Sequence, residues 1–340
     1  MTRTGAGAVA VVGGGSWGTA LALHLARSGF QVRQWVHDPL LARQMNECKE
    51  NSTYLPGYPL PDSLVPSADL GEVLPGADLV LYAVPTQYFR EVLLRARPYF
   101  SPGTRLVIGT KGIERGSALR MSQVARECLL TELRCLAVLS GPSFAEEVAR
   151  GDPTAAVLAC ENPTEARVLQ ETLSQDSFRF YTNRDVVGVE MGGALKNVIA
   201  LAAGVVEGLG LGSNTAAALM TRGLTEVTRL GVSCGGAPAT FSGLAGMGDL
   251  ILTCTGRLSR NRSVGVHLGQ GSGLAEILSK MKMVAEGIPT TSAALMLAQR
   301  QGVEMPITSG VNSILQGDAT PRQAVAALLR RPLKGEESWE

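Results

Sequence analysis

The chain has 340 residues, of which 45% are hydrophobic and 18% are charged, and this balance is ordinary for a soluble globular protein. Its length predicts two domains, each large enough to bury a core of its own. The formal net charge of +1 gives no reason to expect a nucleic acid or an anionic membrane as partner. These values therefore argue against nucleic-acid-binding and membrane-associated classes of protein.

The six cysteines form no Cys-x-x-Cys pair and no cluster with the three histidines. A disulfide framework or a metal site is therefore not expected, and reduced thiols in a cytoplasmic protein are the simpler interpretation. The first glycine-rich turn comes too early to leave room for the apolar segment of a signal peptide. The most membrane-like stretch, residues 198–206, is expected to be too short to span a bilayer, and Glu207 closes it.

The most informative segment follows the apolar run of residues 8–12. It reads Gly13-Gly14-Gly15-Ser16-Trp17-Gly18, a G-x-G-x-x-G pattern, and residues 19–26 are predicted to form the next helix. In this setting the three glycines of the pattern allow a tight turn, close approach of a diphosphate, and close packing of helix against strand. The amides at the helix N-terminus favour an anion. A glycine-rich turn without a ligand is the alternative.

Short apolar or β-branched runs then alternate with helical segments as far as about Asn183. The predicted strands are residues 31–36, 78–84, 105–109, 136–139, 154–158 and 178–181, with a helix from about Leu40. Uninterrupted apolar strands separated by helices predict a mostly parallel sheet covered on both faces, which is the doubly wound α/β arrangement.

Beyond Asp185 the strand pattern ends and helices are predicted instead. The clearest helical segments are residues 186–208, 215–230, 290–302 and 321–329. We therefore expect an α/β domain over residues 1–184 and an all-α domain over residues 185–340. The tail, residues 331–337, is polar and is expected to be frayed.

Lys196 lies in the helical segment 190–200 among small and apolar residues. Gly192 and Gly193 share its face, and each glycine disfavours a helix interior by about 1 kcal/mol relative to alanine. Close approach of a cofactor or of another backbone would explain them. Desolvation there would lower the pKa of the lysine toward the range useful for proton transfer. The alternative is a lysine whose stem covers apolar surface while its amine reaches solvent.

Two further turns follow predicted strands, where open α/β sheets bind ligands. Lys111 follows the strand 105–109, and Ser143 follows the strand 136–139. The alternatives are a solvated loop lysine, and a serine that caps the helix 144–149.

Asp249 directly follows a glycine-rich loop, residues 243–248. The segment Ser259-Arg260-Asn261-Arg262 comes shortly after it. The guanidinium, amide and hydroxyl donors of this second segment suit a phosphate group. The alternatives are an aspartate that caps a helix beginning at Leu250, and a charged surface turn.

Together these motifs resemble those of the bacterial-type NAD(P)-dependent glycerol-3-phosphate dehydrogenases, from residue 9 to about residue 317. The resemblance implies an NAD(P)-binding Rossmann domain over residues 1–184 and a helical substrate-binding and catalytic domain over residues 185–340. It also implies reversible reduction of dihydroxyacetone phosphate to sn-glycerol 3-phosphate by direct hydride transfer, which feeds glycerophospholipid synthesis.

The resemblance further implies a role for individual residues. Lys196 is the proton donor and acceptor, Lys111 and Asp249 flank the reacting carbon, and Asn197 and Thr253 tune the proton relay. The implied substrate-binding residues are Lys111, Gly141, Ser143, Lys196, Asp249, Ser259, Arg260 and Asn261. The implied coenzyme-binding residues are Gly13, Gly15, Ser16, Trp17, Gly18, His37, Tyr54, Lys111, Ala145, Arg260, Val284 and Glu286.

Coenzyme choice depends on the segment that ends the second predicted strand. His37, helped by Arg33 or Arg43, suits the 2′-phosphate of NADP, whereas Asp38 opposes it. NADP is therefore favoured, and use of NAD is left open. An apolar helical domain also makes a homodimer reasonable.

Two other functions compete with this interpretation. Another two-domain Rossmann dehydrogenase, of the ketopantoate or hydroxyacid type, would share the glycines and a helical lysine but would need no phosphate clamp. A non-catalytic NAD(P)-sensing protein would keep the fold but would need no proton donor.

Overall fold

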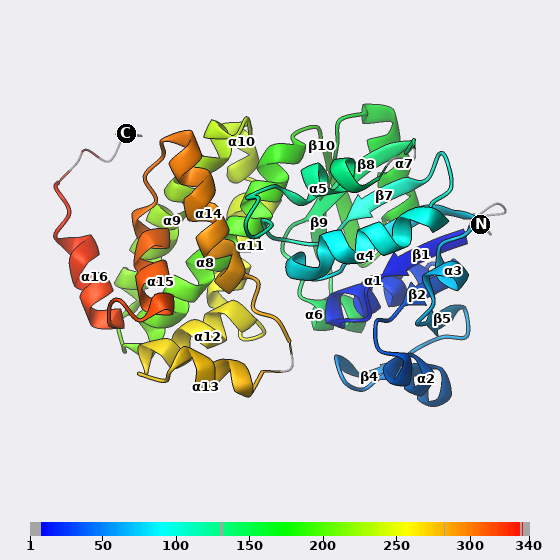
Figure 1. Cartoon of the computed structure of the whole chain (residues 1–340), viewed down its shortest axis with the longest axis horizontal. Helices are drawn as coiled ribbons and strands as arrows, with labels where there is room; N and C mark the ends of the chain where they lie inside the picture. Colours follow the sequence, from blue (N-terminus) through cyan, green and yellow to red (C-terminus); the bar gives the residue numbers. More distant parts are fainter. Residues whose placement is uncertain (1–7, 130–131, 282, 334, 336–340) are drawn as a thin grey trace. The chain divides into compact units, whose positions relative to one another are not determined.

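The computed structural model describes residues 8–129, 132–281, 283–333 and 335. Its internal contacts divide the chain into two compact units (Figure 1). The sheet unit comprises Met1–Thr110 and Met121–Val186, and the helical unit comprises Lys111–Arg120 and Val187–Glu340. The division at residue 186 lies two residues beyond the predicted boundary. The segment 111–120 belongs to the helical unit although it follows a strand of the sheet unit.

The sheet unit is built on an eight-stranded sheet. Its strands are β1 (Ala8–Val12), β2 (Val32–Trp35), β5 (Leu64–Ser67), β6 (Ala77–Tyr82), β7 (Arg105–Ile108), β8 (Cys135–Ser140), β9 (Thr154–Cys160) and β10 (Phe178–Asn183). Their order is β10-β9-β8-β7-β6-β1-β2-β5, and every neighbouring pair is parallel except β8 with β9. The predicted doubly wound, mostly parallel sheet is confirmed.

Helices connect these strands, together with one small hairpin. The helices are α1 (Ser16–Arg27), α2 (Pro39–Cys48), α3 (Leu70–Val73), α4 (Phe89–Ala96), α5 (Met121–Cys128), α6 (Ala145–Arg150) and α7 (Pro163–Leu173), with 3-10 turns η1 (Thr86–Tyr88) and η2 (Arg97–Tyr99). The antiparallel hairpin pairs β3 (Glu50–Asn51) with β4 (Leu55–Pro59). The sequence does not predict β3, β4 or β5, because prolines interrupt β4 and β5 and β3 has only two residues.

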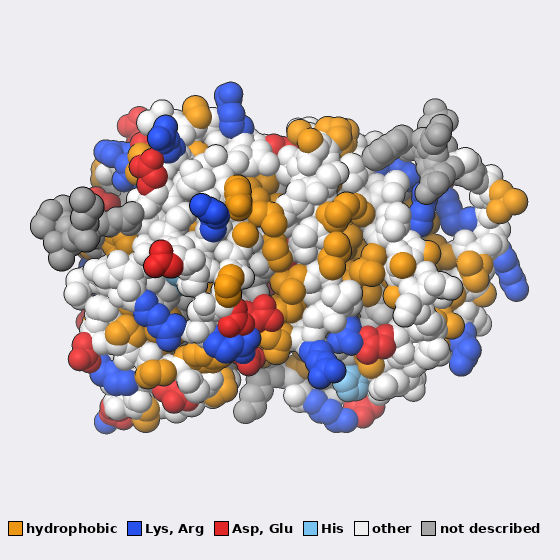
Figure 2. All heavy atoms as spheres, turned by 180° about the vertical axis from the view of Figure 1, so that it is seen from behind, with side chains coloured by type: hydrophobic (Ala, Val, Ile, Leu, Met, Phe, Trp, Pro, Cys, Tyr) orange, Lys and Arg blue, Asp and Glu red, His pale blue; other side chains and the backbone are white. Residues whose placement is uncertain are grey.

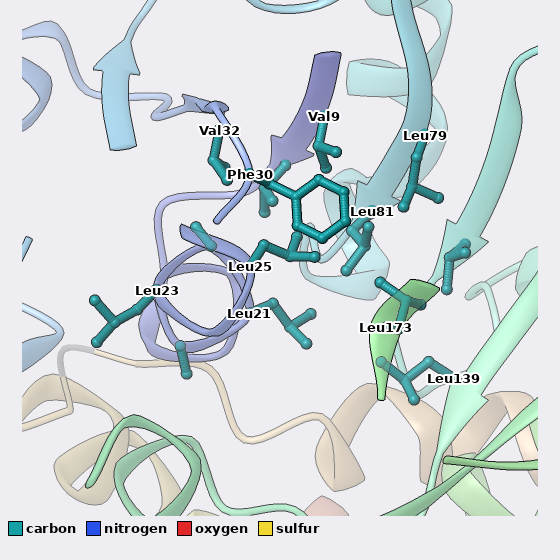
Figure 3. Packing of buried hydrophobic residues seen from close by; sticks show 14 of the residues in the cluster. Val9, Leu21, Leu23, Leu25, Phe30, Val32, Leu79, Leu81, Leu139 and Leu173 are labelled. Atoms are coloured by element: carbon teal, nitrogen blue, oxygen red, sulfur yellow. The ribbon is translucent and has the colours of Figure 1, made fainter. Parts of the chain in front are cut away.

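The core of the sheet unit packs α1 against the central strands β1 and β6. Figure 3 shows Leu21 and Leu25 of α1 among Val9 of β1 and Leu79 and Leu81 of β6, all of which are buried. Alternate residues of a strand point to opposite faces of the sheet. The residues between these are also buried, so both faces of the central strands are covered.

Tyr82 and Phe89 show how the second face is covered. The Tyr82 ring meets the ring of Phe89, the first residue of α4, with centroids 4.8 Å apart. The Tyr82 hydroxyl donates a hydrogen bond to the carbonyl oxygen of Phe89 at 3.3 Å. The carboxyl end of β6 is therefore packed against α4, beside the end of β1, which leads into the glycine-rich loop.

The helical unit contains helices only beyond residue 186 in the described part of the chain. They are α8 (Val186–Gly208), α9 (Ser213–Ser233), α10 (Pro238–Phe241), the π-helical turn η3 (Leu244–Gly248), α11 (Asp249–Thr255), α12 (Arg260–Gly269), α13 (Leu274–Ser279), α14 (Gly287–Gln301), α15 (Pro306–Gln316) and α16 (Pro321–Leu329). The predicted all-α domain is confirmed. Residues 334, 336 and 337 of the tail expected to be frayed lie outside the described residues.

The long helix α8 forms the centre of this unit. It has 23 residues and extends beyond residues 198–206 at both ends, so the expectation of a stretch too short for a bilayer is wrong about length. However, 94% of an apolar 18-residue window of this helix is buried. Helices that are apolar all round are found in cores as well as in membranes, and α8 is a core helix.

Glycines bring α12 into backbone contact with α8. A Cβ atom at Gly204 would lie 2.0 Å from a carbonyl oxygen of α12, and one at Gly265 would lie 2.1 Å from a carbonyl oxygen of α8. Gly208 and Gly269 repeat this arrangement one turn further along. Because no side chain separates the two helices, the start of α12 is fixed relative to α8, which carries Lys196.

Candidate active site

Two lysines, Lys111 and Lys196, share the carboxylate of Asp249 in the helical unit. Asp249 Oδ2 accepts a hydrogen bond from Lys111 Nζ at 2.8 Å, and Asp249 Oδ1 accepts one from Lys196 Nζ. The exposed fractions of the side chains are 16% for Lys111, 9% for Lys196 and 1% for Asp249. Two ammonium groups therefore share one almost fully buried carboxylate. The structure brings together three residues that the sequence separates by 53 and 138 positions.

The amine of Lys196 lies inside the unit. Besides its bond to Asp249, it donates to Thr253 Oγ1 at 2.9 Å. The alternative of an amine that reaches solvent is therefore wrong. The close approach of another backbone segment explains the glycine at position 192, one turn earlier on α8. A Cβ atom at Gly192 would lie 2.6 Å from the carbonyl oxygen of Ala245 in η3.

Burial and neighbouring charges set the titration of this cluster. Burial lowers the pKa of Lys196 to about 8, Lys111 acts in the same direction, and Asp249 opposes them. Burial alone would raise the pKa of Asp249, but Lys111 and Lys196 outweigh it and hold that pKa below its usual value. The carboxylate thus stays ionised, while Lys196 can exchange a proton near neutral pH.

Asp249 does not cap a helix, contrary to the alternative drawn from the sequence. It is the first residue of α11, whose N-cap is Gly248, and its carboxylate is used by the two lysines. Thr253, one turn later, donates its hydroxyl to the carbonyl oxygen of Asp249 at 2.6 Å. That bond leaves the Thr253 oxygen directed to accept from Lys196.

The segment that carries Lys111 is fastened to α8 at several points. Ile113 is completely buried in the core cluster of the helical unit. Arg120, at the end of the segment, forms an ion pair with Glu190 of α8, and both side chains are largely buried. Lys111 is therefore no solvated loop lysine. The sequence analysis missed Arg120 and Glu190, although an acidic residue within a strongly apolar helix was a usable signal.

A chain of amides connects the start of α12 to α8 and α14. Asn261 Nδ2 donates to Asn197 Oδ1 at 2.9 Å, and Asn261 Oδ1 accepts from the backbone amide of Gly287 at 2.9 Å. Asn197 Nδ2 lies 3.4 Å from the carbonyl oxygen of Lys111. Ser259 caps α12 by accepting from the amide of Arg262. Since Asn261 and Ser259 are buried, the alternative of a charged surface turn is wrong.

Arg260 begins α12 and is half-buried. Burial lowers the pKa of its guanidinium, and the negative charge of Glu286 acts in the opposite direction. Glu286 stands at the N-cap of α14, and Val284 is half-buried two residues before it. A guanidinium partly withdrawn from water at a helix N-terminus favours an anion such as a phosphate.

In the sheet unit, the glycine-rich loop has the geometry that a dinucleotide requires. Gly13 has a φ of +134°, and a Cβ atom there would lie 2.6 Å from the carbonyl oxygen of Ala83. A Cβ atom at Gly18 would lie 2.1 Å from the carbonyl oxygen of Gly13, whereas at Gly15 it would meet nothing within 4 Å. Gly13 and Gly18 thus keep the turn compact, and the open position at Gly15 fits close approach of a diphosphate.

Ser16 and Trp17 open α1 directly after this loop. The indole Nε1 of Trp17 donates to the carbonyl oxygen of Gly109, which follows β7, at 3.2 Å. The indole is thereby held against the carboxyl end of the sheet, where ligands of doubly wound sheets bind.

His37 is exposed two residues after the end of β2, with its ring 5.7 Å from that of Trp35. Asp38 caps α2, because its carboxylate accepts from the backbone amide of Leu40 at 2.9 Å. Arg33 donates to two backbone carbonyls, and Arg43 pairs with a glutamate one turn later. Of the residues predicted to choose the coenzyme, Arg33 and Asp38 are thus both engaged in hydrogen bonds to the backbone.

The loop after β8 holds Gly141 and Ser143. Gly141 has a φ of +133°, and a Cβ atom there would lie 2.9 Å from the Cα atom of Ala156. The Ser143 hydroxyl donates to the carbonyl oxygen of Gly141 at 2.9 Å, and α6 begins at Ala145 with Phe144 as its N-cap. The alternative that Ser143 caps this helix is therefore wrong, because its hydroxyl turns back into the loop. Ala145, like Tyr54 after β3, is half-buried.

Comparisons with known proteins match both parts of the chain, the N-terminal part with the sheet and the C-terminal helical part. A sequence model of the NAD-dependent glycerol-3-phosphate dehydrogenase N-terminus matches residues 8–166, and the model of the C-terminus matches residues 185–326. The chain is 52% identical over 329 residues to the glycerol-3-phosphate dehydrogenase (NAD(P)+) of Geobacter sulfurreducens, covering 96% of this chain and 98% of that protein. It is 50% identical over 335 residues to the enzyme of Acidobacterium capsulatum, covering 96% and 99%.

The fold gives the same result. The structure matches the crystal structure of glycerol-3-phosphate dehydrogenase from Coxiella burnetii with a TM-score of 0.92 and 43% sequence identity. The match covers 96% of this chain and 99% of that one, so both units are included. The chain belongs to the NAD-dependent glycerol-3-phosphate dehydrogenase family.

Proposed function

We propose that this chain catalyses the reversible NAD(P)H-dependent reduction of dihydroxyacetone phosphate to sn-glycerol 3-phosphate, and that this reaction supplies glycerophospholipid synthesis. The observation that carries the proposal is the buried carboxylate of Asp249 shared by Lys111 and Lys196. A binding protein that only senses a nucleotide has no use for a buried lysine with a pKa of about 8. A ketone reductase needs such a proton donor.

Lys196 provides the acid. A bound reduced nicotinamide would supply a hydride to the C2 carbon of the substrate. The role of Lys196 Nζ is to donate a proton to the negative charge that develops on the C2 oxygen. Because Lys196 stands on the rigid core helix α8, its amine is positioned before the substrate arrives. In the reverse direction the neutral amine accepts the proton of the alcohol.

Asp249 and Lys111 adjust this acid. The Asp249 carboxylate keeps the Lys196 ammonium from losing its proton too easily, and it also fixes the direction of the amine. Lys111 adds a second positive charge beside the carboxylate, which favours the oxyanion of the transition state. Thr253 accepts a hydrogen bond from Lys196 and completes the orientation of the amine.

Arg260 is the residue we propose for the substrate phosphate. Asn261 uses its amide nitrogen on Asn197 and its oxygen on Gly287, so its role includes fixing the start of α12. Ser259 supports the same turn as its cap. A remote phosphate supplies binding energy that orients a small carbonyl substrate, and Arg260 would hold it with charge-assisted hydrogen bonds.

The coenzyme is NADP or NAD, and we propose a preference for NADP. Asp38, the residue that would oppose a 2′-phosphate, accepts from the backbone of α2. His37 beside it is exposed and suits a phosphate, with Arg43 on the next helix as a second basic group. Gly13, Gly15, Ser16, Trp17, Gly18 and Tyr54 are proposed to hold the rest of the dinucleotide, together with Ala145, Val284, Glu286, Lys111 and Arg260.

We further propose a cytoplasmic homodimer that acts on small molecules, with neither a nucleic acid nor a membrane as partner. On the face drawn in Figure 2, basic and acidic side chains are interspersed, in keeping with the net charge of +1. Exposed apolar side chains of the helical unit, such as Ile251 (48%) and Leu258 (42%), support a contact between copies. Sedimentation of the purified protein would measure its mass in solution.

The direct test is a spectrophotometric assay of NADPH and NADH oxidation with dihydroxyacetone phosphate, its non-phosphorylated analogue dihydroxyacetone, and ketopantoate. We expect oxidation with dihydroxyacetone phosphate and little with the other two. Turnover of ketopantoate in place of dihydroxyacetone phosphate would favour the other class of dehydrogenase, and absence of any turnover would favour a sensor.

Arg260→Ala sharpens this test, with Arg322→Ala on the exposed surface of α16 as its control. Loss of Arg260 should raise the KM for dihydroxyacetone phosphate by about 10- to 100-fold, which corresponds to one or two charged hydrogen bonds. The activity with dihydroxyacetone should hardly change. If Arg260→Ala and the wild-type protein had the same ratio of activity with dihydroxyacetone phosphate to activity with dihydroxyacetone, Arg260 would not bind the substrate phosphate.

A further inference from the structure

A network of three buried polar side chains lies behind the glycine-rich loop of the sheet unit. Gln34 of β2, Asn51 of β3 and Thr19 of α1 are each completely inaccessible to solvent. Burying a polar group without a hydrogen-bond partner destabilises a protein by about 1–3 kcal/mol. Buried polar side chains at these positions are therefore expected to form hydrogen bonds with neighbouring groups and to hold those groups in place.

The two amide groups hold successive carbonyls of the loop. Gln34 Nε2 donates to the carbonyl oxygen of Gly13 at 2.9 Å and to Thr19 Oγ1 at 3.1 Å. Asn51 Nδ2 donates to the carbonyl oxygen of Gly14 at 2.9 Å and to Thr19 Oγ1 at 2.8 Å. The Thr19 hydroxyl oxygen thus accepts one bond from each amide and keeps both at the correct distance from the loop.

The orientation of each amide follows from what it faces. A carbonyl oxygen can only accept, so Gln34 and Asn51 must present their nitrogen atoms to the loop. Asn51 Oδ1 is fixed at its other end by the backbone amide of Tyr54 at 3.1 Å. Gln34 Oε1, in contrast, is buried and has no hydrogen-bond partner within the described part of the chain. The position of Gln34 is therefore set by the carbonyl and hydroxyl that its nitrogen holds.

In a trans peptide the carbonyl oxygen and the following amide hydrogen point in opposite directions. When the carbonyls of Gly13 and Gly14 are directed toward the network, the amides of Gly14 and Gly15 are directed away from it. Rotation of either peptide plane would replace an amide hydrogen by a carbonyl oxygen at the surface of the loop. Such an oxygen would repel a diphosphate, whereas amides attract one.

We propose that Gln34, Asn51 and Thr19 are positioning residues for coenzyme binding, which keep the loop in the one peptide orientation that accepts a diphosphate. The identity of the ligand rests on the proposed function. The same network gives the β3–β4 hairpin a role, because Asn51 connects the loop to Tyr54, a proposed coenzyme contact. Glycines make this loop conformation accessible, and the buried network selects it among the others that glycine allows.

The experiment measures the Kd for NADPH by fluorescence titration without substrate, together with the Tm of each variant. Thr19→Val removes the shared oxygen at constant shape, Thr19→Ser restores it, and Asn51→Leu and Gln34→Leu each remove one amide. Gln170→Leu is the matched control, since Gln170 Nε2 also donates to a backbone carbonyl, that of Phe180 in β10 at 2.7 Å.

We expect Thr19→Val, Asn51→Leu and Gln34→Leu to raise the Kd for NADPH by about tenfold or more, which corresponds to the loss of roughly one hydrogen bond. Thr19→Ser should stay close to wild type, and Gln170→Leu should lower the Tm without changing the Kd. In steady-state assays the KM for NADPH should rise, while kcat at saturating NADPH stays within about twofold because the chemical step is untouched.

A wild-type Kd in folded Thr19→Val and Asn51→Leu would overturn the proposal, as would an equal loss of binding in Gln170→Leu. If Asn51→Leu or Gln34→Leu does not fold, the pair Thr19→Val and Thr19→Ser still decides. Failure of the proposed function has a different signature: the wild-type protein would bind NADPH yet reduce no dihydroxyacetone phosphate, and the ratio of variant to wild-type Kd would still test the network.

Discussion

The candidate sites of the two units consist of different chemical groups. In the sheet unit, the backbone forms the site: a tight turn at Gly13, an open position at Gly15 and the start of α1. In the helical unit, charged side chains form the site, and the buried carboxylate of Asp249 balances two ammonium groups. The backbone site therefore depends on its glycines and on the buried side chains that orient its peptides, whereas the site of buried charges depends on the charged groups themselves.

This difference has an energetic side. Removal of one partner from a buried ion pair leaves the other charge without compensation, which destabilises a protein by about 3–5 kcal/mol. Lys196, Lys111 and Asp249 therefore support each other as a unit, and we expect single substitutions among them to be strongly non-additive. Substitutions of Gln34, Asn51 or Thr19 in the folded protein should instead act on coenzyme binding and leave kcat at saturating NADPH almost unchanged.

The largest effect should come from Lys196→Ala, which removes the proposed acid. We expect kcat for reduction of dihydroxyacetone phosphate to fall by about 10³-fold, within the range typical of general acid catalysis, while the Kd for NADPH stays unchanged. Lys280→Ala, at an exposed lysine of the same unit, is the control and should keep full activity. A decrease of less than tenfold in Lys196→Ala would mean that another group delivers the proton.

Gly265→Ala tests whether backbone contact between α8 and α12 supports the helical site. A methyl group there would lie 2.1 Å from the carbonyl oxygen of Leu201. We expect the free energy of unfolding, measured with urea, to fall by about 1–3 kcal/mol because α12 must move away from α8. The KM for dihydroxyacetone phosphate should rise as well, since Arg260 and Asn261 begin α12. Unchanged stability would show that the two helices separate easily.

His37→Asp tests the sheet unit at its most exposed proposed contact. An acidic side chain would repel a 2′-phosphate and accept hydrogen bonds from a ribose diol. We expect the ratio of kcat/KM for NADPH to that for NADH to fall by about tenfold, or about 1.4 kcal/mol. His267→Asp, at an exposed histidine of α12, is the control. The same ratio in wild type and His37→Asp would place coenzyme choice elsewhere.

Gly310→Ala should have the smallest effect and the opposite sign. Gly310 lies inside α15, and the nearest atoms to a Cβ there are 4.0 Å away. Alanine should therefore increase the free energy of unfolding by about 0.5–1 kcal/mol, since it favours the helix without a clash. Urea denaturation beside Gly265→Ala measures both. A loss of stability at Gly310 would show that glycine-to-alanine changes are harmful throughout this unit, whatever the contact.

The two units also differ in how much of them the sequence reveals. The glycine-rich loop and the parallel strands are predictable because three glycines at this spacing after a strand, and continuous apolar runs between helices, are each typical of few structures. The small elements β3, β4 and β5 are not, because β3 has only two residues and prolines interrupt β4 and β5. Their absence from the prediction also hid Asn51.

The charged cluster lies at the other extreme. Lys196 attracts attention only through its apolar surroundings, and the alternative of a lysine reaching solvent fits the same pattern. Neither Lys111 nor Asp249 can be assigned to it from spacing alone, because the contact depends on how η3, α8 and the segment 111–120 pack. The resemblance to a known family supplied these residues, and the structure supplied their contacts.

The pH dependence of dihydroxyacetone phosphate reduction tests the central claim, that Lys196 is the acid, most directly. Reduction requires protonated Lys196, so kcat should fall as the pH rises through about 8, and oxidation of glycerol 3-phosphate should rise over the same range. In Asp249→Asn the midpoint should move to lower pH, because the charge that raises the pKa of Lys196 is gone. A midpoint that is the same in Asp249→Asn and wild type, or a rate of reduction that is flat across this range, would contradict the account.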